Sequence, residues 1–225
     1  MINFTTSEEN YIKSIYHLQK DTDTVNTNSL AAEMQTSPAS VTDMLKKLKG
    51  KKLLQYERYR GFKLNENGRK VALGVVRKHR LWEYFLVEKL GFAWDKVHPI
   101  AEELEHISSD ELIKRLEQFL GNPAFDPHGD PIPDRNGNIP VIKQLGLTQL
   151  PLKKQVVVSS VANQTPQMLE MLRHYHIGIG TKLTVIKKFE FDGSLEIKVL
   201  KQPSCMLSEQ VAKNVFVHYD QLKEQ

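Results

Sequence analysis

Hydrophobic periodicity divides the chain into a helical part and a β part. As far as Gly121, apolar positions recur at spacings of three and four residues, which is typical of helices that bury one face. From Val156 onward they fall into short runs (VVVSSV, KLTVIKKF, SLEIKVL and NVFVHY), which are typical of strands. Between them, residues 122–154 are rich in Pro, Gly, Asp and Asn, and this composition predicts a linker.

The first third of the chain predicts three helices and a hairpin. The segments ENYIKSIYHLQK and NSLAAEM have a helical period, and TSPASVTDMLKKLKG is a helix with clear ends. Ser37 is its expected N-cap, Pro38 its first helical residue and Gly50 its C-terminal stop. The following LLQYERYRGFKLNENG predicts a β-hairpin that turns at Arg60-Gly61. Two short helices followed by a hairpin predict a winged helix-turn-helix.

Three more helices are expected before the linker. One should run from about Asn67 to Leu90, one should start near Pro99, and SDELIKRLEQFLG should form the last. The β part, with one short helix at about Pro166–Tyr175, fits a small SH3-like β-barrel of about 70 residues. The expected fold class is therefore mainly α with β. The expected domains are a DNA-binding domain (1–72), a helical dimerisation and metal-binding domain with its linker (73–140), and the barrel (150–225).

Positive charge is concentrated in the winged-helix segment. Residues 1–75 carry 12 Lys and Arg against 8 Asp and Glu, whereas the remainder carries 19 of each. A local basic surface favours a polyanionic partner, and the second helix of a helix-turn-helix enters the DNA major groove. The expected DNA-binding residues are Thr36, Ser37, Pro38, Ala39, Ser40 and Thr42 at the start of that helix, and Lys46, Lys47, Arg58 and Arg60 for phosphates.

A second group of residues has the spacing of a metal site. His79 and Glu83 are four residues apart on one predicted helix, and the next helix brings His98, Glu102, Glu105 and His106. Imidazoles and carboxylates without thiolates suit divalent ions such as Mn²⁺, Fe²⁺, Co²⁺, Ni²⁺ and Zn²⁺. Three carboxylates would leave two such ions near charge balance. Surface ion pairs are the structural alternative.

Two other functions compete with a metal-dependent regulator. The winged helix could serve a regulator that senses an organic ligand, with the His/Glu cluster only structural. Glu103 and His106 also read as Glu-x-x-His, the motif of di-metal carboxylate enzymes. Such enzymes need this motif on two helices, and the sequence offers His79 and Glu83 in the opposite order. We therefore expect no enzyme and no small organic substrate.

Composition indicates the cellular compartment in which the protein is expected. No window approaches the roughly 18 apolar residues of a membrane span, and the N-terminus lacks a signal-peptide pattern. The single cysteine, Cys205, excludes a disulfide framework. A cytoplasmic protein without a membrane partner is expected.

These features together resemble the diphtheria-toxin-repressor family of metal-dependent transcriptional regulators, which includes iron-dependent repressors and manganese transport regulators. The resemblance covers about Thr6 to Pro133. It is carried by ENYIKSIYHL, SPASVTDMLKKL, YRGFKLNENGRK, RKHRLWEYFL, EELEHISSDE and HGDPIP. It implies a repressor of metal-uptake genes that binds a palindromic double-stranded DNA operator as a homodimer activated by Mn²⁺ or Fe²⁺.

The resemblance also implies how the ligands are divided. His79, Glu83 and His98 would form one metal position, and Glu102, Glu105 and His106 with Asn10 the other. Gln164 and Gln167 fall near the place where the barrel of some members adds a ligand, and Gln167 is the candidate. Glu102 matches the manganese type, whereas the iron type has Cys there. Asn10 replaces the Asp of the manganese type, and Lys13 stands where that type carries an acid.

Overall fold

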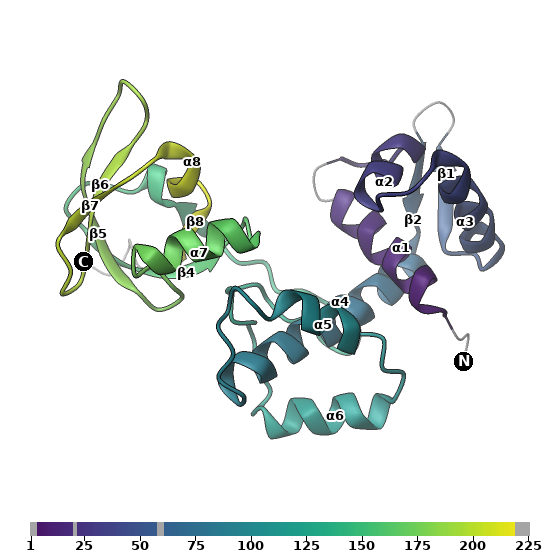
Figure 1. Cartoon of the computed structure of the whole chain (residues 1–225). Helices are drawn as coiled ribbons and strands as arrows, with labels where there is room; N and C mark the ends of the chain where they lie inside the picture. The colour runs from purple at the N-terminus through teal and green to yellow at the C-terminus, as the bar shows by residue number, and fades with distance from the viewer. Residues whose placement is uncertain (1–3, 20–21, 58–60, 219–225) are drawn as a thin grey trace. The chain divides into compact units, whose positions relative to one another are not determined.

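The protein, seen as a computed structural model (Figure 1), comprises two compact units. The structure describes residues 4–19, 22–57 and 61–218. Unit 1 comprises Met1–His79, Glu102–Leu116 and Pro133–Ile139, and unit 2 comprises Arg80–Ala101, Glu117–Ile132 and Pro140–Gln225. Within the described residues, no helix is both long and apolar enough to span a bilayer.

Unit 1 begins with the expected winged helix-turn-helix. Its elements are helices α1 (Thr6–Leu18), α2 (Thr27–Glu33) and α3 (Pro38–Gly50), followed by strands β1 (Leu54–Glu57) and β2 (Gly61–Leu64). The strands pair antiparallel, and Val25 forms a bridge to Phe62 of β2. Apolar faces of all three helices meet the hairpin in one core, and Ile12, Ile15, Leu30, Val41 and Leu48 are fully buried there.

Side chains cap the N-termini of α1 and α3, and α3 extends through the expected stop Gly50 to its C-cap Lys51. At α1, the Thr5 hydroxyl accepts a hydrogen bond from the Glu8 amide and the Glu8 carboxylate accepts one from the Thr5 amide. At α3, Ser37 is the N-cap and Pro38 the first helical residue, as expected. Such caps satisfy amide groups that the first helical turn leaves without partners.

Three further helices follow the hairpin. They are α4 (Glu66–Glu88), α5 (His98–Leu104) and α6 (Asp110–Phe119), each within two residues of its expected start. Helix α4 ends two residues before the expected Leu90, and the chain turns at Gly91, which has a positive φ of 71°. These helices carry every expected metal ligand except Asn10 and Gln167, or place it directly after a helix.

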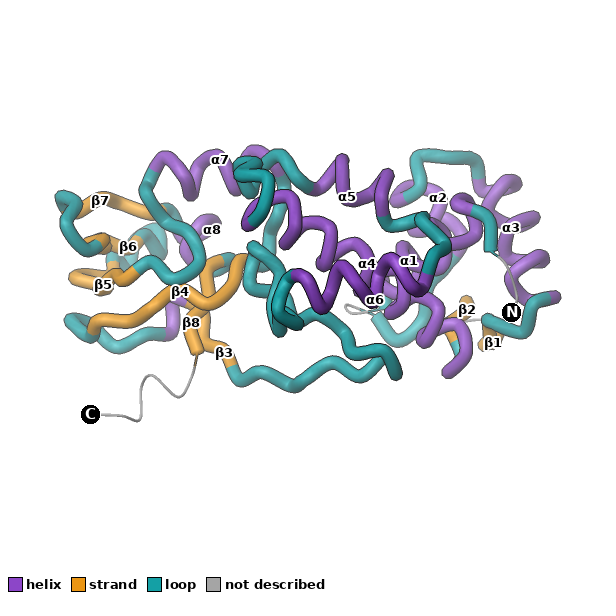
Figure 2. The backbone as a smooth tube through the Cα atoms, turned by 90° about the horizontal axis from the view of Figure 1, so that it is seen from below, coloured by secondary structure: helices purple, strands orange, loops and turns teal. Residues whose placement is uncertain are grey.

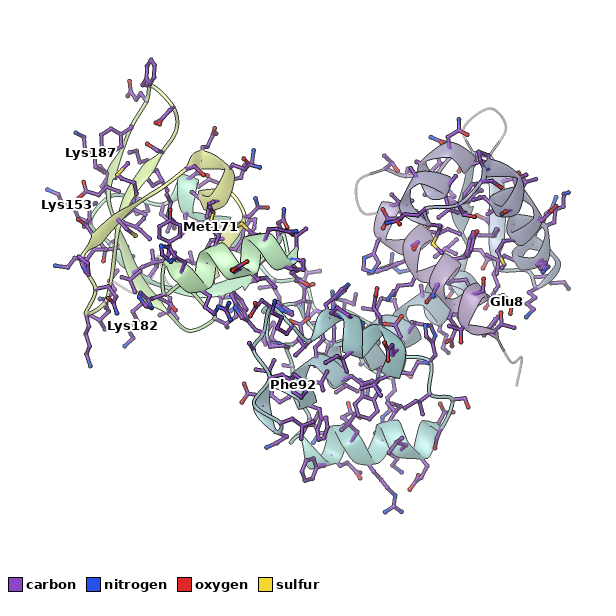
Figure 3. The ribbon with its side chains drawn as sticks, in the orientation of Figure 1. Glu8, Phe92, Lys153, Met171, Lys182 and Lys187 are labelled. Carbon is purple, nitrogen blue, oxygen red and sulfur yellow. The ribbon has the colours of Figure 1, made fainter. Side chains whose placement is uncertain are left out.

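Unit 2 contains the expected small β domain. Its six antiparallel strands are ordered β3-β8-β4-β5-β6-β7 (Figure 2). The elements are β3 (Gln144–Gly146), a 3₁₀ turn η1 (Leu147–Gln149), β4 (Gln155–Val161), α7 (Pro166–His174), β5 (Lys182–Lys188), β6 (Leu195–Val199), β7 (Ser204–Leu207), α8 (Glu209–Ala212) and β8 (Val215–His218). Lys153, Lys182 and Lys187 project outward from the β domain, and Met171 lies on the exposed side of α7 (Figure 3).

The segment expected to be a linker is partly built into the core of unit 2, and this corrects the sequence interpretation. His128 accepts a hydrogen bond from the Val161 amide through its carbonyl oxygen at 3.0 Å, and Arg80 donates to the carbonyl of Pro131 at 2.6 Å. Asp126, His128 and Gly129 are buried. Composition suggested a solvated segment, but tertiary hydrogen bonds satisfy its backbone. Strands β3 and β7 and helix α8 were also missed, because β3 and α8 are short and β7 contains no β-branched residue.

Candidate DNA-binding face and metal sites

Helix α3 has one buried and one exposed face. Val41, Leu45 and Leu48 pack into the core of unit 1. The expected residues of the opposite face are exposed, apart from the half-buried Thr36: they are Ser37, Pro38, Ala39, Ser40, Thr42, Lys46 and Lys47. A helix held by such an apolar stripe can present its outer side to a large partner without losing its own packing.

Local hydrogen bonds order the start of α3. The Ser37 hydroxyl oxygen accepts from the Ser40 amide at 3.1 Å and lies 2.9 Å from the Ser40 hydroxyl. The Thr42 hydroxyl donates to the Pro38 carbonyl at 2.9 Å. These short polar side chains therefore have fixed directions at the end of the helix that reads base edges in a helix-turn-helix.

The expected phosphate-binding cations differ in their surroundings. Lys46 forms an exposed ion pair with Asp43, with 3.0 Å between Nζ and Oδ1. Lys47 is exposed on the same helix. Arg58 and Arg60, also expected to contact phosphates, lie outside the described residues.

In unit 1, Glu105 is the centre of a charged cluster. Its side chain is fully buried, and its two oxygens face different partners. Oε1 lies 2.6 Å from the ammonium nitrogen of Lys13, and Oε2 lies 2.6 Å from Nδ1 of His79. The same ammonium lies 3.5 Å from Oε1 of the half-exposed Glu102. Lys13, which sequence reasoning noted only as a departure from the manganese type, is thus the direct partner of two expected ligands.

His106 joins the same unit through a residue that sequence reasoning missed. Its Nδ1 lies 2.6 Å from Oε2 of Glu9, and its Nε2 lies 3.7 Å from Oε1 of Glu105. Lys78 lies 3.4 Å from the other oxygen of Glu9. Asn10 follows Glu9 on α1 and is half-buried. The helical period of α1 gave no sign that Glu9 would meet His106, 97 residues away.

In unit 2, Glu83 faces two imidazoles. Its Oε1 lies 3.3 Å from Nδ1 of His98, whose side chain is 49% exposed. Its Oε2 lies 3.5 Å from Nδ1 of His128, which is buried. His79 occupies the position one turn before Glu83 on α4. The structure thus brings His98 to Glu83, as the resemblance implied, and adds His128, which the sequence had not placed among the ligands.

A hydrogen bond of the His128 ring determines which of its nitrogens carries the proton in the neutral form. Nε2 lies 2.9 Å from the carbonyl oxygen of Trp94, and because a carbonyl only accepts, Nε2 must carry the proton. The ring stacks on that of Trp94, with 5.6 Å between centroids. In the neutral imidazole, the lone pair on Nδ1 therefore points toward Glu83. Ligand atoms of Glu83, Asp126 and His128 lie within 4.8 Å of one another.

Burial and charge perturb the ionisation of this group. Burial raises the pKa of the Asp126 carboxyl to about 7, and the charges of Asp130 and Glu83 add to that shift against Arg80 and His128. Burial disfavours the imidazolium of His128, but Glu83 and Asp126 outweigh it, and the pKa of His128 is raised. Two buried carboxylates beside an imidazole need positive charge, which a proton, Arg80 or a divalent ion can supply.

The expected ligand from the β domain is not tested by these contacts. Gln167 is exposed on α7. The amide of Gln164 donates to the carbonyl of Val161 at 3.3 Å, so this side chain takes part in local structure.

Comparison with protein families matches almost the whole chain in three segments. "Iron dependent repressor, N-terminal DNA binding domain" matches residues 3–62, "Iron dependent repressor, metal binding and dimerisation domain" matches 65–134, and "FeoA domain" matches 145–219. The first match covers the winged helix, and the second covers the helices that carry the His/Glu groups. The third meets the β domain, whose SH3-like class is thereby confirmed.

Individual relatives give the same assignment. The diphtheria toxin repressor of Corynebacterium jeikeium is 32% identical over 166 residues, which cover 72% of this chain and 69% of that protein. The iron-dependent repressor IdeR of Mycobacterium tuberculosis is 34% identical over 133 residues, but the match spans only 58% of its length. Among solved structures, a "manganese-dependent transcriptional repressor complex with manganese" has a TM-score of 0.81 at 33% identity, over 94% of this chain and 99% of that one.

Sequence similarity and fold thus indicate the same protein family. The chain belongs to the diphtheria-toxin-repressor family of iron-dependent repressors.

Proposed function

We propose that the protein is a metal-dependent, DNA-binding transcriptional repressor. The observation that carries the proposal is helix α3. It buries Val41, Leu45 and Leu48 while exposing an ordered polar start and Lys47, on a chain that also places His98 against the buried Glu83. Ser37, Ser40 and Thr42 would reach base edges, while Lys46, Lys47, Arg58 and Arg60 would hold phosphates. Thr36, Pro38 and Ala39 would line the same contact.

The proposed metal position comprises His79, Glu83 and His98. Two imidazoles and one carboxylate suit Mn²⁺ or Fe²⁺, and the fit is supported by the buried Glu83 next to His98. Glu105 would hold His79 by accepting from Nδ1, so that Nε2 becomes its ligand atom. A bound ion would supply the positive charge that the buried carboxylates need. Gln167 stays a prediction as a further ligand.

Metal would then act by stabilising the DNA-binding form of a dimer. We propose domains at 1–72, 73–140 and 150–225, with the second forming a homodimer. Two α3 helices about 34 Å apart would match a palindromic operator. A ligand that binds one conformation better shifts the population toward it, and DNA must raise metal affinity by the same factor. A coupling of about 1–3 kcal/mol is ordinary for such a switch.

The dimer proposal is supported by exposed apolar side chains in unit 2. Phe119 at the end of α6 is 66% exposed, and Leu90 and Phe92, which follow α4, are 55% and 41% exposed. The ammonium of Lys89 lies 5.7 Å from the centre of the Phe119 ring, which places Phe119 beside the end of α4. Exposed apolar patches of this kind mark association surfaces. The site of action would be the cytoplasm, and we propose no catalytic role.

The test is recovery of DNA by the purified protein. Sheared DNA from the source genome is incubated with the protein and Mn²⁺, with Fe²⁺ without oxygen, or with chelator, and the retained fragments are sequenced. We expect palindromic fragments to be retained only with metal. The more effective ion would identify the activator. Equal retention in chelator would contradict the metal requirement.

A second candidate is a winged-helix regulator that senses an organic ligand. It is favoured by a cavity of about 850 Å³ in unit 2, lined by Tyr84, Trp94, Phe125, Arg173 and Ile179 among others. The size and apolar lining are those of small-molecule sites. DNA retention that is unchanged by chelator, but changed by small-molecule extracts of the source cells, would favour this function.

A further inference from the structure

The group expected to hold a second metal ion already contains a cation. The ammonium of Lys13, on α1, lies 2.6 Å from Oε1 of Glu105 and 3.5 Å from Oε1 of Glu102. The Lys13 side chain is 12% exposed and that of Glu105 is fully buried. An ion pair of this burial is far less screened than one at the surface.

This arrangement does not fit a divalent ion bound at the same place. An ion would have to approach Oε1 of Glu105 to about 2.0–2.6 Å, which is the position the ammonium nitrogen now takes. The other oxygen, Oε2, faces Nδ1 of His79 at 2.6 Å. An ion and the ammonium would also repel each other strongly in a buried site. Asn10, the expected ligand from α1, would bring no negative charge to offset that repulsion.

We infer that the ammonium of Lys13 takes the place of the second metal ion, so that the protein binds one divalent ion per chain. This inference rests on the proposed function, because it assumes that His79, Glu83 and His98 hold the other ion. Glu102 and Glu105 then neutralise Lys13 instead of a metal, and His106 pairs with Glu9.

Lys13 also explains how α1 is held without metal. The pair between Lys13 and Glu105 connects residues 92 positions apart in unit 1. The contact between His106 and Glu9 forms a second connection from α1 to the segment after α5. Glu105 becomes a positioning residue, since it receives Lys13 on one oxygen and orients His79 with the other. Metal would therefore act on the protein only through the remaining position.

The test counts bound Mn²⁺ on the full-length protein. Electron paramagnetic resonance measures the unbound ion at increasing Mn²⁺, for the wild type and for Lys13→Gln. We expect the wild type to bind one ion per chain and Lys13→Gln to bind two. Lys78→Gln is the matched control. It removes a different ammonium, which pairs with Glu9 of α1, and should leave the count at one ion per chain.

Glu102→Gln decides where each ion sits. In the wild type it should leave the count unchanged, and in Lys13→Gln it should remove the additional ion. The inference would be overturned if the wild type bound two ions per chain. It would also be overturned if the wild type bound one ion and Glu102→Gln removed it. A folded Lys13→Gln that still binds one would overturn it as well. If Lys13→Gln does not fold, Glu102→Gln in the wild type still gives a decision.

Failure of the proposed function would look different. Glu83→Gln should remove the single wild-type ion. If it did not, or if the wild type bound none, the metal position at His79, Glu83 and His98 would be wrong. Lys13→Gln would still test the role of Lys13: one ion more than in the wild type would support it, and an unchanged count would contradict it.

Discussion

At the scale of single residues, buried carboxylates in unit 1 form ion pairs with nearby lysines. Glu105 faces Lys13, and Glu8 faces Lys51, with 2.7 Å between Oε2 and Nζ. Removing Lys13 should cost more than its pair contributes, because Glu105 would stay buried without compensation, whereas Lys51 is partly exposed. The pairs therefore restrict which substitutions α1 tolerates.

Glu8 gives a prediction about pH. Its burial opposes ionisation, but hydrogen bonds from Lys51 and Thr5 and the charge of Lys51 outweigh it, and the pKa of Glu8 lies below its usual 4.5. Stability from the ionised form is thus present above pH 4.5 and is lost as pH falls through the lowered pKa. We expect Glu8→Gln to lower the free energy of unfolding by about 0.5–1 kcal/mol at pH 7.

The measurement is urea unfolding of both proteins from neutral to acid pH. The difference between them should shrink as pH falls below 4.5. Glu33→Gln, at an exposed position of α2, should change little at any pH. A Glu8→Gln effect that is constant with pH would show that the charge of Glu8 is not responsible.

At the scale of elements, α3 should act as the electrostatic contact to DNA. Lys47→Ala should weaken binding to all DNA sequences and reduce the slope of log affinity against log salt by about 1, because one phosphate contact is lost. Filter binding over a range of salt concentrations measures both quantities. Lys182→Ala, in the β domain (Figure 3), is the control and should leave the slope unchanged. A loss confined to one operator would contradict the phosphate role of Lys47.

The turn at Gly129 fixes the HGDPIP segment in unit 2. Gly129 has a φ of 87°, and a Cβ added there would lie 1.9 Å from the carbonyl oxygen of Ser159 in β4. Both the backbone conformation and the close approach exclude a side chain. We expect Gly129→Ala to destabilise unit 2 by about 2 kcal/mol or more.

Thermal unfolding followed by circular dichroism measures this effect. Gly178→Ala is the matched control in the same unit, because its φ is not positive and an added Cβ would meet nothing within 4 Å. An equal melting temperature for Gly129→Ala and the wild type would mean that the segment can move away from β4.

At the scale of the whole molecule, the proposed dimer depends on the apolar patch around Phe119. A charge there would have to be buried on association, so Phe119→Glu should weaken dimerisation about tenfold or more. Sedimentation at several concentrations measures the dimer, and binding to a palindromic operator should weaken in parallel. Phe191→Glu, at the fully exposed Phe191, is the control. An unchanged dimer would place the interface elsewhere.

The sequence by itself determined most of the elements and their order, but not β3, β7 and α8. Helical period, the cap at Ser37 and short apolar runs act over a few positions, so they can be recognised without the fold. They predicted the winged helix, the helices that carry the His/Glu groups and the small β domain. Local spacing also predicted that His79 and Glu83 share one helix face, and the family resemblance implied that His98 lies near Glu83.

Only the tertiary structure decided which charges meet. Glu9 and His106, Lys13 and Glu105, and His128 and Glu83 come from segments far apart in the sequence. Their pairing depends on the core packing that brings the helices together, which has no sequence period. The same packing buries the HGDPIP segment that composition assigned to a linker. The sequence therefore suggested a set of candidate ligands, and the fold placed Lys13 against one of their carboxylates, Glu105.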